Sequence, residues 1–182
     1  MIIIGITGTL GAGKGTVVDY LVREKGFRHF SVRAFLLEKI RELGLTENRD
    51  SMLLVGNRLR AEHGPSYAVD QLFLRARESG GNAVIESVRT TGEVASLRQK
   101  GRFMLVAVDA DPKLRYERIV LRNSETDRVS FETFMENEQR ESVSMDPAVP
   151  NLPACIRLAD HVLLNNGTVE ELYEELGKIL NF

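Results

Sequence analysis

Short apolar runs and longer amphipathic stretches alternate along the chain. The apolar runs are bounded by glycine or by a charged residue and are too short for helices, which is typical of buried strands. We expect strands at Ile2–Thr7, Phe27–Ser31, Ala83–Glu86, Phe103–Asp109 and His161–Leu164. Between them apolar residues recur at helical spacing. We expect helices at Thr16–Lys25, Val32–Leu43, Asp50–Glu62, Ser66–Glu78, Gly92–Lys100, Asp111–Leu121, Phe131–Ser142 and Val169–Leu180.

The polar segments Asn123–Asp127 and Asp146–Pro153, the second rich in proline, are expected to be loops. The alternation of strands and helices predicts a three-layer α/β/α fold, with a mostly parallel five-stranded sheet between two layers of helices. The chain has 182 residues, which suits a single domain over residues 1–182. In sheets of this kind ligands bind beyond the carboxyl ends of the strands.

Composition narrows the range of partners. Apolar residues make up 43% of the chain and charged residues 27%, as in ordinary globular proteins. A net charge of −2 gives no overall basic field, so we expect no nucleic acid polymer as a partner. No apolar run approaches the roughly 20 residues of a membrane span, and we expect a cytoplasmic protein without a membrane partner. Cys155 is the only cysteine and is interpreted as a small buried hydrophobe.

The first apolar run leads into a glycine-rich turn, a lysine and a helix. Gly8, Gly11 and Gly13 let successive backbone N–H groups point at an anion, and Lys14 adds positive charge for the outer phosphates. The helix that follows presents its N-terminus to the same anion. We therefore expect a phosphate-binding loop for ATP, made by Gly8, Leu10, Gly11, Ala12, Gly13, Lys14, Gly15 and Thr16.

The loop departs from its common pattern directly after the lysine. That residue is Gly15, and the hydroxyl that usually ligates Mg²⁺ comes one place later, at Thr16. We expect Thr16 to contact an inner phosphate and Mg²⁺ to be held mainly by phosphate oxygens and water. Glu86 ends an apolar strand and is the expected metal contact through water. The order of the glycines, with no acid at the end of the second strand, excludes a dinucleotide-binding fold.

At these positions the chain resembles the nucleoside monophosphate kinase family of phosphate-loop kinases and, in the same superfamily, the dephospho-coenzyme A kinases. The segment Gly11–Thr16 is similar to the adenylate-kinase form of the loop. The segment Ile85–Arg89 is similar to the one where such kinases carry an acid, a small residue and an arginine. The segment Ala159–Gly167 is similar to the late strand and turn of dephospho-coenzyme A kinases. The order of elements is similar over nearly the whole chain.

The resemblance implies a P-loop NTPase fold with a helical acceptor-binding insert and a short lid. Its core would cover about 1–31, 81–121 and 154–182, its insert about 32–80, and its lid about 122–153. In the family the late turn lies beside the donor base. That makes Asn166 and Gly167 candidate nucleotide contacts.

Phosphoryl transfer depends on positioned positive charge, and the planar fork of arginine suits phosphate oxygens. Arg33 and Arg89 follow the ends of the second and third strands, and Arg122 opens the lid. Arg115 and Arg118 share a helix face with Arg122, where ion pairs would explain them equally well; Arg118 is counted as a nucleotide contact. The candidate catalytic residues are Lys14, Glu86, Arg89, Arg122, Arg128 and Arg140. The candidate acceptor-binding residues are Ser31, Arg33, Arg58 and Arg89.

The favoured function is transfer of the γ-phosphate of ATP to a nucleoside or deoxynucleoside monophosphate, whose phosphate needs positive charge rather than a base. The alternative is a dephospho-coenzyme A kinase, in which Glu86 would serve as the base for a hydroxyl. A nucleotide-binding switch lacks support because the chain has no Asn-Lys-x-Asp motif, and a non-catalytic ATP-binding module stays open.

Three further points concern acceptor specificity, metal binding by histidine, and assembly. Adenylate kinases place an acid and then an arginine at the start of the acceptor helix, where this chain has Arg33 and Leu36, so AMP is not predicted as the acceptor. The three histidines, His29, His63 and His161, show no metal-ligand spacing and are interpreted as structural or exposed. A monomer and a homodimer both remain possible.

Overall fold

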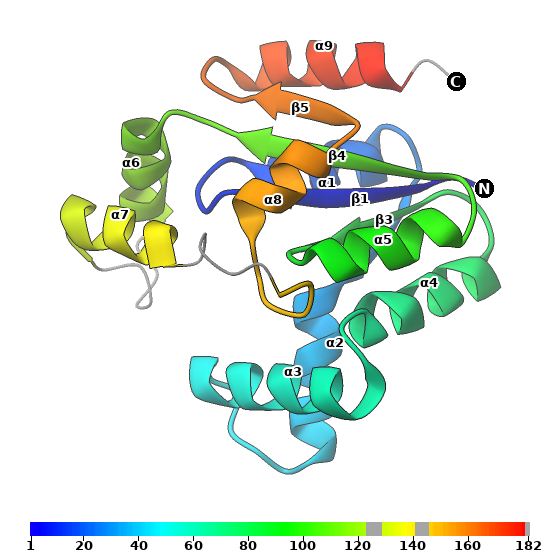
Figure 1. Cartoon of the computed structure of the whole chain (residues 1–182). Helices are drawn as coiled ribbons and strands as arrows, with labels where there is room; N and C mark the ends of the chain where they lie inside the picture. The colour runs from blue at the N-terminus through cyan, green and yellow to red at the C-terminus, as the bar shows by residue number, and fades with distance from the viewer. Residues whose placement is uncertain (123–128, 141–145, 181–182) are drawn as a thin grey trace.

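The computed structural model describes residues 1–122, 129–140 and 146–180. Its centre is a five-stranded sheet with every strand pair parallel, in the order β2-β3-β1-β4-β5. The strands are β1 Ile3–Gly8, β2 Arg28–Ser31, β3 Ala83–Glu86, β4 Phe103–Asp109 and β5 His161–Leu164. The predicted α/β fold is confirmed, and the parallel order puts the carboxyl ends of all five strands at one edge of the sheet (Figure 1).

Helices connect the strands and cover the sheet. They are α1 Lys14–Arg23, α2 Val32–Glu42, α3 Arg49–His63, α4 Tyr67–Ser79, α5 Thr91–Gln99, α6 Pro112–Arg122, α7 Phe131–Arg140, α8 Leu152–Leu158 and α9 Val169–Ile179. Each expected helix is present, with ends that differ by a few residues. Two predicted features, the loop Asn123–Asp127 and the last two residues of the helix Phe131–Ser142, lie outside the described residues.

Helix α8 was not expected, and the predicted loop Asp146–Pro153 is wrong at its end. Asn151 caps the helix by accepting a hydrogen bond from the N–H of Ala154 (3.0 Å). Pro153 lies in the first turn, where a helix leaves its N–H groups unpaired and a proline is tolerated. Proline therefore starts a helix here, and α8 buries Cys155 completely, as the sequence predicts for that side chain.

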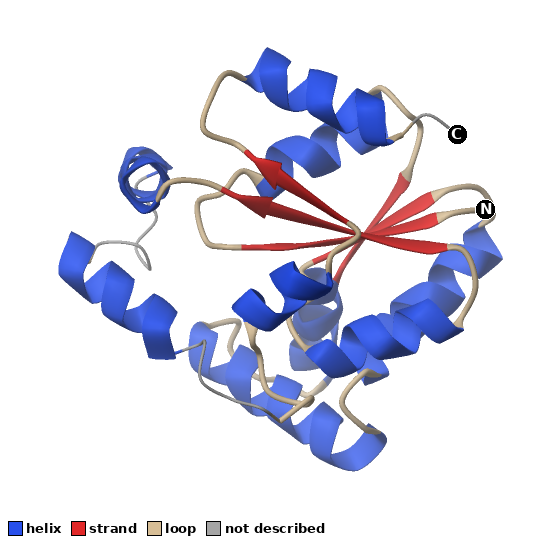
Figure 2. Cartoon of the chain, turned by 45° about the horizontal axis from the view of Figure 1, so that its top comes forward, coloured by secondary structure: helices blue, strands red, loops and turns tan. Residues whose placement is uncertain are grey.

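Helices cover both faces of the sheet (Figure 2), and an apolar cluster lies on each face. On one face α1 and α9 pack on Ile4 and Ile6, and on the other α4, α5 and α8 pack around Ile3 and Leu105. Every residue of β1 is buried because this strand lies at the centre of the sheet. Burial on both faces explains why its apolar run is continuous rather than alternating.

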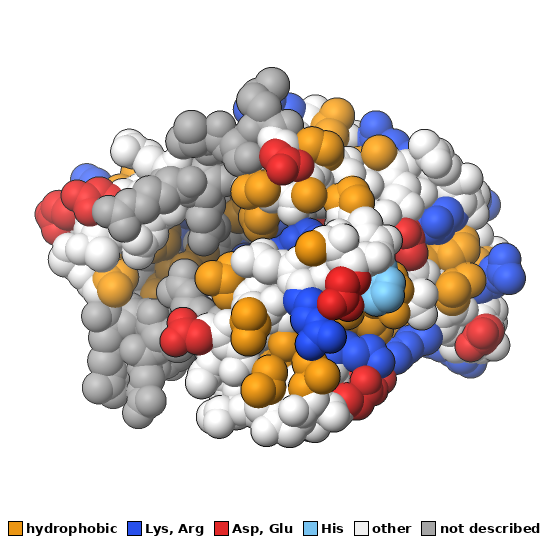
Figure 3. Space-filling model, turned by 60° about the horizontal axis from the view of Figure 1, so that its bottom comes forward, with side chains coloured by type: hydrophobic (Ala, Val, Ile, Leu, Met, Phe, Trp, Pro, Cys, Tyr) orange, Lys and Arg blue, Asp and Glu red, His pale blue; other side chains and the backbone are white. Residues whose placement is uncertain are grey.

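Between β2 and β3 the chain forms α2, α3 and α4, called the helical arm below (residues 32–79). Arg75 of α4 donates two 2.8 Å hydrogen bonds to Glu38 of α2 and lies over the ring of Phe35. Phe35 is buried and contacts Tyr67 of α4 edge-on. The outer surface of the arm mixes basic, acidic and hydrophobic side chains (Figure 3). The arm stands beside the strand ends, where the sequence predicts the acceptor-binding insert.

Helix α7, which falls inside the predicted lid, packs on α6. Tyr116 of α6 contacts the rings of Phe131 and Phe134, and Phe134 is 4% exposed. Arg115 lies over the Phe134 ring and donates to both carboxylate oxygens of Glu138. In this state α7 is anchored to the core. No helix of the described ranges is long and apolar enough to cross a membrane.

Candidate functional site

The phosphate loop joins β1 to α1, and contacts with three different elements fix its glycines. Gly8, Gly11 and Gly13 have φ angles of 136°, 78° and 100°, a region that side chains strongly disfavour. A Cβ atom on Gly8 would strike β4, one on Gly11 would strike the backbone of α6, and one on Gly13 would strike Asn165. Gly15 has open space around it, so nothing in the fold explains that glycine.

Side chains from distant parts of the chain hold the loop. The hydroxyl of Thr9 donates a 2.6 Å hydrogen bond to Asp109 at the end of β4, and the amide of Asn165 donates to the carbonyl of Ala12 (2.8 Å). Arg115 reaches the carbonyl of Leu10 at 3.4 Å. The sequence analysis missed Asp109 and Asn165 as parts of the site, because they come 100 and 153 residues after the groups they hold.

Lys14 lies folded back over the loop. Its Nζ donates to the carbonyls of Gly8 (2.9 Å) and Thr9 (2.7 Å). Burial, then the positive charge of Arg89, lower the pKa of Lys14 to about 8 against the opposing effect of Glu86. The positive charges of Lys14 and Arg89 therefore act on the same place, and an anion bound there would neutralise them.

The turn after β3 presents Arg89 to this place. Ser87 has a φ of 73°, a strained value for a residue with a side chain, which costs roughly 1–3 kcal/mol. Val88 is fully buried, and its N–H donates to the carbonyl of Ile6 in β1 (3.1 Å). The carbonyl of Arg89 accepts from the N–H of Asn151 at 2.9 Å, while its side chain is exposed. These two backbone hydrogen bonds thus hold the turn, while the guanidinium of Arg89 stays accessible.

Glu86 pairs with a histidine that the sequence analysis interpreted as structural or exposed. His29 Nε2 lies 3.0 Å from Glu86 Oε2. Residues 29 and 31 of β2 share a face, and the register sets Ser31 beside Glu86, so His29 is a diagonal cross-strand neighbour. The bond to His29 is the main reason that the pKa of Glu86 is lowered; the charges of Lys14 and Arg89 act in the same direction. This contact depends on the register of β2 on β3, so the sequence alone carried no signal for it.

At the turn after β5, Arg118 of α6 donates from Nη2 to the carbonyl of Asn165 (2.9 Å). Its Nη1 is buried and has no hydrogen-bond partner among the described residues, which leaves a donor for a ligand. The side chain of Asn166 accepts from the N–H of Asp111 (2.8 Å), and Gly167 packs against Glu171. Arg118, Asn166 and Gly167 therefore lie close to the loop-holding Asn165.

The structure also gives the positions of several other predicted site residues. Arg122 lies within electrostatic reach of Lys14. Ser31 caps α2 by accepting from the N–H of Ala34, and Arg33 in the first turn of α2 is exposed. Arg58 pairs with Glu62 on the exposed face of α3. Two candidates are not described: Arg128 lies outside the described residues, and so does the side chain of Arg140 at the end of α7.

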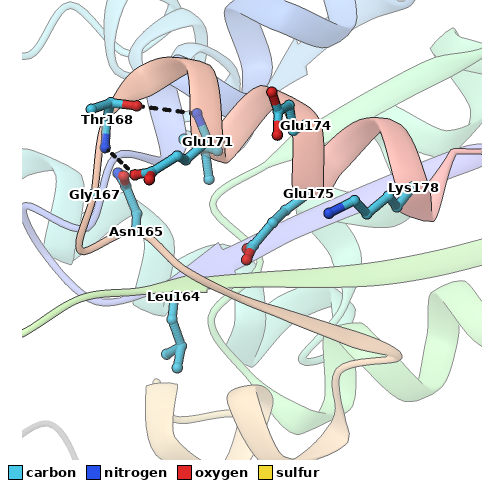
Figure 4. Close-up of a pocket in the computed structure, with 9 residues that line it drawn as sticks. Leu164, Asn165, Gly167, Thr168, Glu171, Glu174, Glu175 and Lys178 are labelled. Carbon is cyan, nitrogen blue, oxygen red and sulfur yellow. Dashed lines mark hydrogen bonds between the residues drawn. The ribbon is translucent and has the colours of Figure 1, made fainter.

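A polar pocket of about 270 Å³ lies between β5 and α9 (Figure 4). Glu171, Glu174, Glu175 and Lys178 line it, and two capping hydrogen bonds join Thr168 and Glu171 at the start of α9. Three carboxylates against one ammonium repel a phosphate group. This pocket is therefore not the phosphate site.

A second and much smaller pocket, of about 20 Å³, lies between the helical arm and α5 and is called the arm pocket below. Its apolar residues come from all three helices of the arm and the α3–α4 turn, and two charged residues, Arg60 and Glu93, complete it. Glu93 accepts hydrogen bonds from the N–H groups of Arg89 and Thr90 (2.8 and 3.0 Å). Glu93 thus connects the arm pocket to the turn that carries Arg89. Neither charged residue is among the site residues predicted from the sequence.

Comparison with known proteins places these features in a family. Residues 4–144 match a family model described as an AAA domain. A UPF0200 protein of Sulfurisphaera tokodaii is 30% identical over 178 residues, which cover 98% of this chain and 95% of that protein. A UPF0200 protein of Thermococcus gammatolerans is 31% identical, with 99% and 93% covered.

Solved structures show the same fold. TT1252 from Thermus thermophilus has a TM-score of 0.63 at 23% identity, covering 98% of this chain and 96% of that one. A shikimate kinase from Bacteroides thetaiotaomicron has a TM-score of 0.60 at 14% identity, with 100% and 99% covered. The phosphate loop, the 2-3-1-4-5 parallel sheet and these matches agree: the chain belongs to the AAA domain family and, with its UPF0200 relatives, has the fold of small P-loop kinases.

Proposed function

We propose that the protein transfers the γ-phosphate of ATP to a nucleoside monophosphate. The observation that carries this proposal is the meeting of Lys14 from the phosphate loop with Arg89 and Glu86 from the turn after β3, all within electrostatic reach of one another. A loop for the donor phosphates and an arginine for a second phosphate thus lie side by side. The helical arm stands next to that arginine and offers an acceptor site.

The donor side follows from the loop. The left-handed φ angles of its glycines would let backbone N–H groups point at a phosphate, α1 starts at Lys14, and the helix N-terminus adds positive potential for the phosphates of ATP. Lys14 would leave the carbonyls of Gly8 and Thr9 for the outer phosphates. Arg118, with a donor free of described partners, would contact the nucleotide beside Asn165.

The residues at this place also fit Mg²⁺. The lowered pKa of Glu86 keeps its carboxylate ionised, and carboxylate oxygen is the kind of ligand that Mg²⁺ takes through water. Thr16 supplies a hydroxyl in the first turn of α1, whereas Gly15 supplies nothing. When bound, the metal would neutralise charge on the outer phosphates.

A phosphate acceptor suits the positive groups on the acceptor side. The guanidinium groups of Arg33 and Arg89 are exposed, and neither donates a hydrogen bond to another described residue. A monophosphate attacks through an oxygen that is already anionic, so it needs these charges and no base. We therefore assign Arg33 and Arg89 to the acceptor phosphate.

One contact favours a second candidate, a kinase with a hydroxyl acceptor such as dephospho-coenzyme A. The pairing of His29 with Glu86 at 3.0 Å orients a carboxylate beside the phosphate loop. A hydroxyl must lose a proton when it attacks, and an oriented carboxylate is the group that receives it. A phosphate acceptor gives the pair no such task.

An acceptor panel separates the two candidates. ADP release from ATP and Mg²⁺ is measured with each nucleoside and deoxynucleoside monophosphate, with dephospho-coenzyme A and without acceptor. We expect at least one monophosphate to accelerate ADP release well above the acceptor-free rate, and Glu86→Gln to retain part of that activity. If dephospho-coenzyme A is the only productive acceptor and Glu86→Gln is inactive with it, the hydroxyl kinase replaces our proposal.

A further inference from the structure

Strand β5 forms one edge of the sheet. It pairs with β4 on one side, and no strand of the described ranges lies on its other side. An edge strand carries backbone N–H and C=O groups that can pair with a further strand, and natural edges are often protected by lysine or proline. Strand β5 contains neither, and three of its four residues, His161, Val162 and Leu164, are exposed. This edge is therefore open to an added strand.

The two faces of β5 differ in character. Successive side chains of a strand point to opposite faces, and Leu163 is buried in the apolar cluster that contains Leu172 and Leu176 of α9. Val162 and Leu164 therefore lie on the other face, and Figure 4 shows Leu164 pointing away from α9. On that face α8 packs on β1 and β4, and Val162 and Leu164 stay 47% and 63% exposed. This face thus presents two uncovered apolar side chains beside the free edge.

On the α9 side, the polar pocket of about 270 Å³ follows the same strand and is called the acidic groove below. Glu171, Glu174 and Glu175 line it and are exposed, and Lys178 is the one basic residue among those that line it. Its volume equals about nine water molecules in the liquid, so the groove has room for the long side chain of a lysine or arginine. Three carboxylates against one ammonium favour such a cationic group.

We propose that the free edge of β5 binds an extended segment of a partner protein in which basic and apolar residues alternate. The segment adds a sixth strand to the sheet by backbone hydrogen bonds to β5. Its basic side chains enter the acidic groove, and the apolar side chains between them cover Val162 and Leu164. In this mode of recognition the backbone bonds supply affinity and the alternate side chains supply specificity. The proposal does not depend on the reaction assigned to the phosphate loop.

The charges of α9 argue against a second copy of this chain as the occupant. Pairing of β5 with β5 across a two-fold axis would set the same surface of each copy opposite itself and join the two sheets into one. Both α9 helices would then lie on the same face, each with four glutamates and one lysine. Like charges at that distance repel, and β5 itself carries no lysine or arginine to offset them. A basic partner meets no such repulsion.

The test uses labelled synthetic peptides as probes and fluorescence anisotropy as the measurement. A short peptide of alternating lysine and valine is expected to bind the whole chain, and to bind more weakly as the salt concentration rises. A peptide of alternating glutamate and valine has the opposite charge and is expected not to bind. A lysine–valine peptide with proline at its centre keeps the charge but loses a backbone donor, and is expected to bind at least about fivefold more weakly.

Matched variants locate the contact on the protein. Glu174→Gln combined with Glu175→Gln removes two carboxylates of the acidic groove and is expected to weaken binding of the lysine–valine peptide about fivefold. Glu62→Gln combined with Glu78→Gln makes the same change on exposed residues of the helical arm and is expected to leave binding unchanged. An equal loss in both pairs would mean attraction to the overall charge and would overturn the inference.

Backbone exchange separates strand addition from attraction between charges alone. Amide hydrogen exchange of His161–Leu164 is expected to slow when the lysine–valine peptide binds, while exchange of β2 at the other edge stays unchanged. Binding without slower exchange in β5 would overturn the inference, and so would equally strong binding of the proline peptide or the glutamate peptide.

A second copy of the chain is tested by sedimentation velocity of the protein alone. A monomer is expected. A dimer that Val162→Asp converts into a monomer would assign the free edge to a second copy and overturn the inference. Val162 is 47% exposed, so the substitution leaves the buried clusters untouched.

Discussion

At the scale of single residues, Lys14 is held by its own loop and repelled by its neighbours. Its ammonium bonds two loop carbonyls, while burial and Arg89 lower its pKa to about 8. The unfolded chain keeps this proton up to a pKa near 10.5, so the folded state binds fewer protons between those values. Lys14 therefore lowers the stability of the unliganded fold below pH 8, and that loss fades as the pH rises toward 10.5.

This balance predicts a pH dependence of ATP binding. Phosphates favour the charged lysine, so ATP affinity is expected to fall as the pH rises through about 8. Equilibrium titrations with ATP between pH 6.5 and 9.5 measure the effect. Lys14→Arg serves as the control because a guanidinium keeps its proton throughout this range. An identical pH dependence in wild type and Lys14→Arg would contradict the role given to Lys14.

A second prediction at this scale concerns the loop glycines. Gly13→Ala puts a Cβ into the amide of Asn165 at a φ of 100°, and the left-handed conformation alone costs roughly 1–2 kcal/mol. Gly15→Ala meets open space inside α1 and is expected to stabilise the fold by about 0.5–1 kcal/mol. Urea unfolding of both variants checks this pair. Equal stability changes in the two would refute the account of the loop.

At the scale of elements, α7 belongs to the packed core rather than hanging free. It inserts Phe134 between Tyr116 and Arg115 of α6, and Arg115 in turn reaches the phosphate loop. A lid that carries α7 must therefore break or carry along these contacts when it moves. Closure of residues 122–153 over the nucleotide remains a prediction.

Removing the packing of α7 on α6 is expected to lower the free energy of unfolding by a measurable amount. Phe134→Ala is expected to destabilise the protein by about 3 kcal/mol, because it removes a buried ring and leaves a cavity beside the rings of Tyr116 and Phe131. Leu121→Ala on α6, a side chain 84% exposed, is expected to change stability by less than about 0.5 kcal/mol. Denaturant unfolding measures both. A Phe134→Ala protein as stable as Leu121→Ala would mean that α7 does not hold to α6 as described.

At the scale of the whole molecule, what the sequence could predict depends on how local the signal is. The phosphate loop is a contiguous motif beside a central strand, so it was predicted residue by residue, and the alternation of elements predicted the sheet. The pairs Thr9–Asp109 and His29–Glu86 join residues 100 and 57 positions apart. Such pairs depend on sheet register, which a single sequence does not contain.

Other misses have their own physical reasons. Helix α8 was missed because its proline lies in the first turn, where it is tolerated, and not in the interior, where it breaks helices. The assignment of Arg58 to the acceptor stays a prediction: in the structure Arg58 pairs with Glu62 on the exposed face of α3, and Arg60, two positions later, lines the arm pocket. The two side chains differ in position because residues 58 and 60 lie at different angles around α3.

The central claim is that Lys14 and its surroundings catalyse phosphoryl transfer to a small acceptor. The most direct measurement is acceptor-dependent ADP formation by wild type and Lys14→Ala, with thermal unfolding recorded for both. Losing one donor to the transferring group costs on the order of 10²–10³ in rate, so the account predicts a loss of that size with an intact fold. Near-wild-type ADP formation by a folded Lys14→Ala protein would contradict the claim.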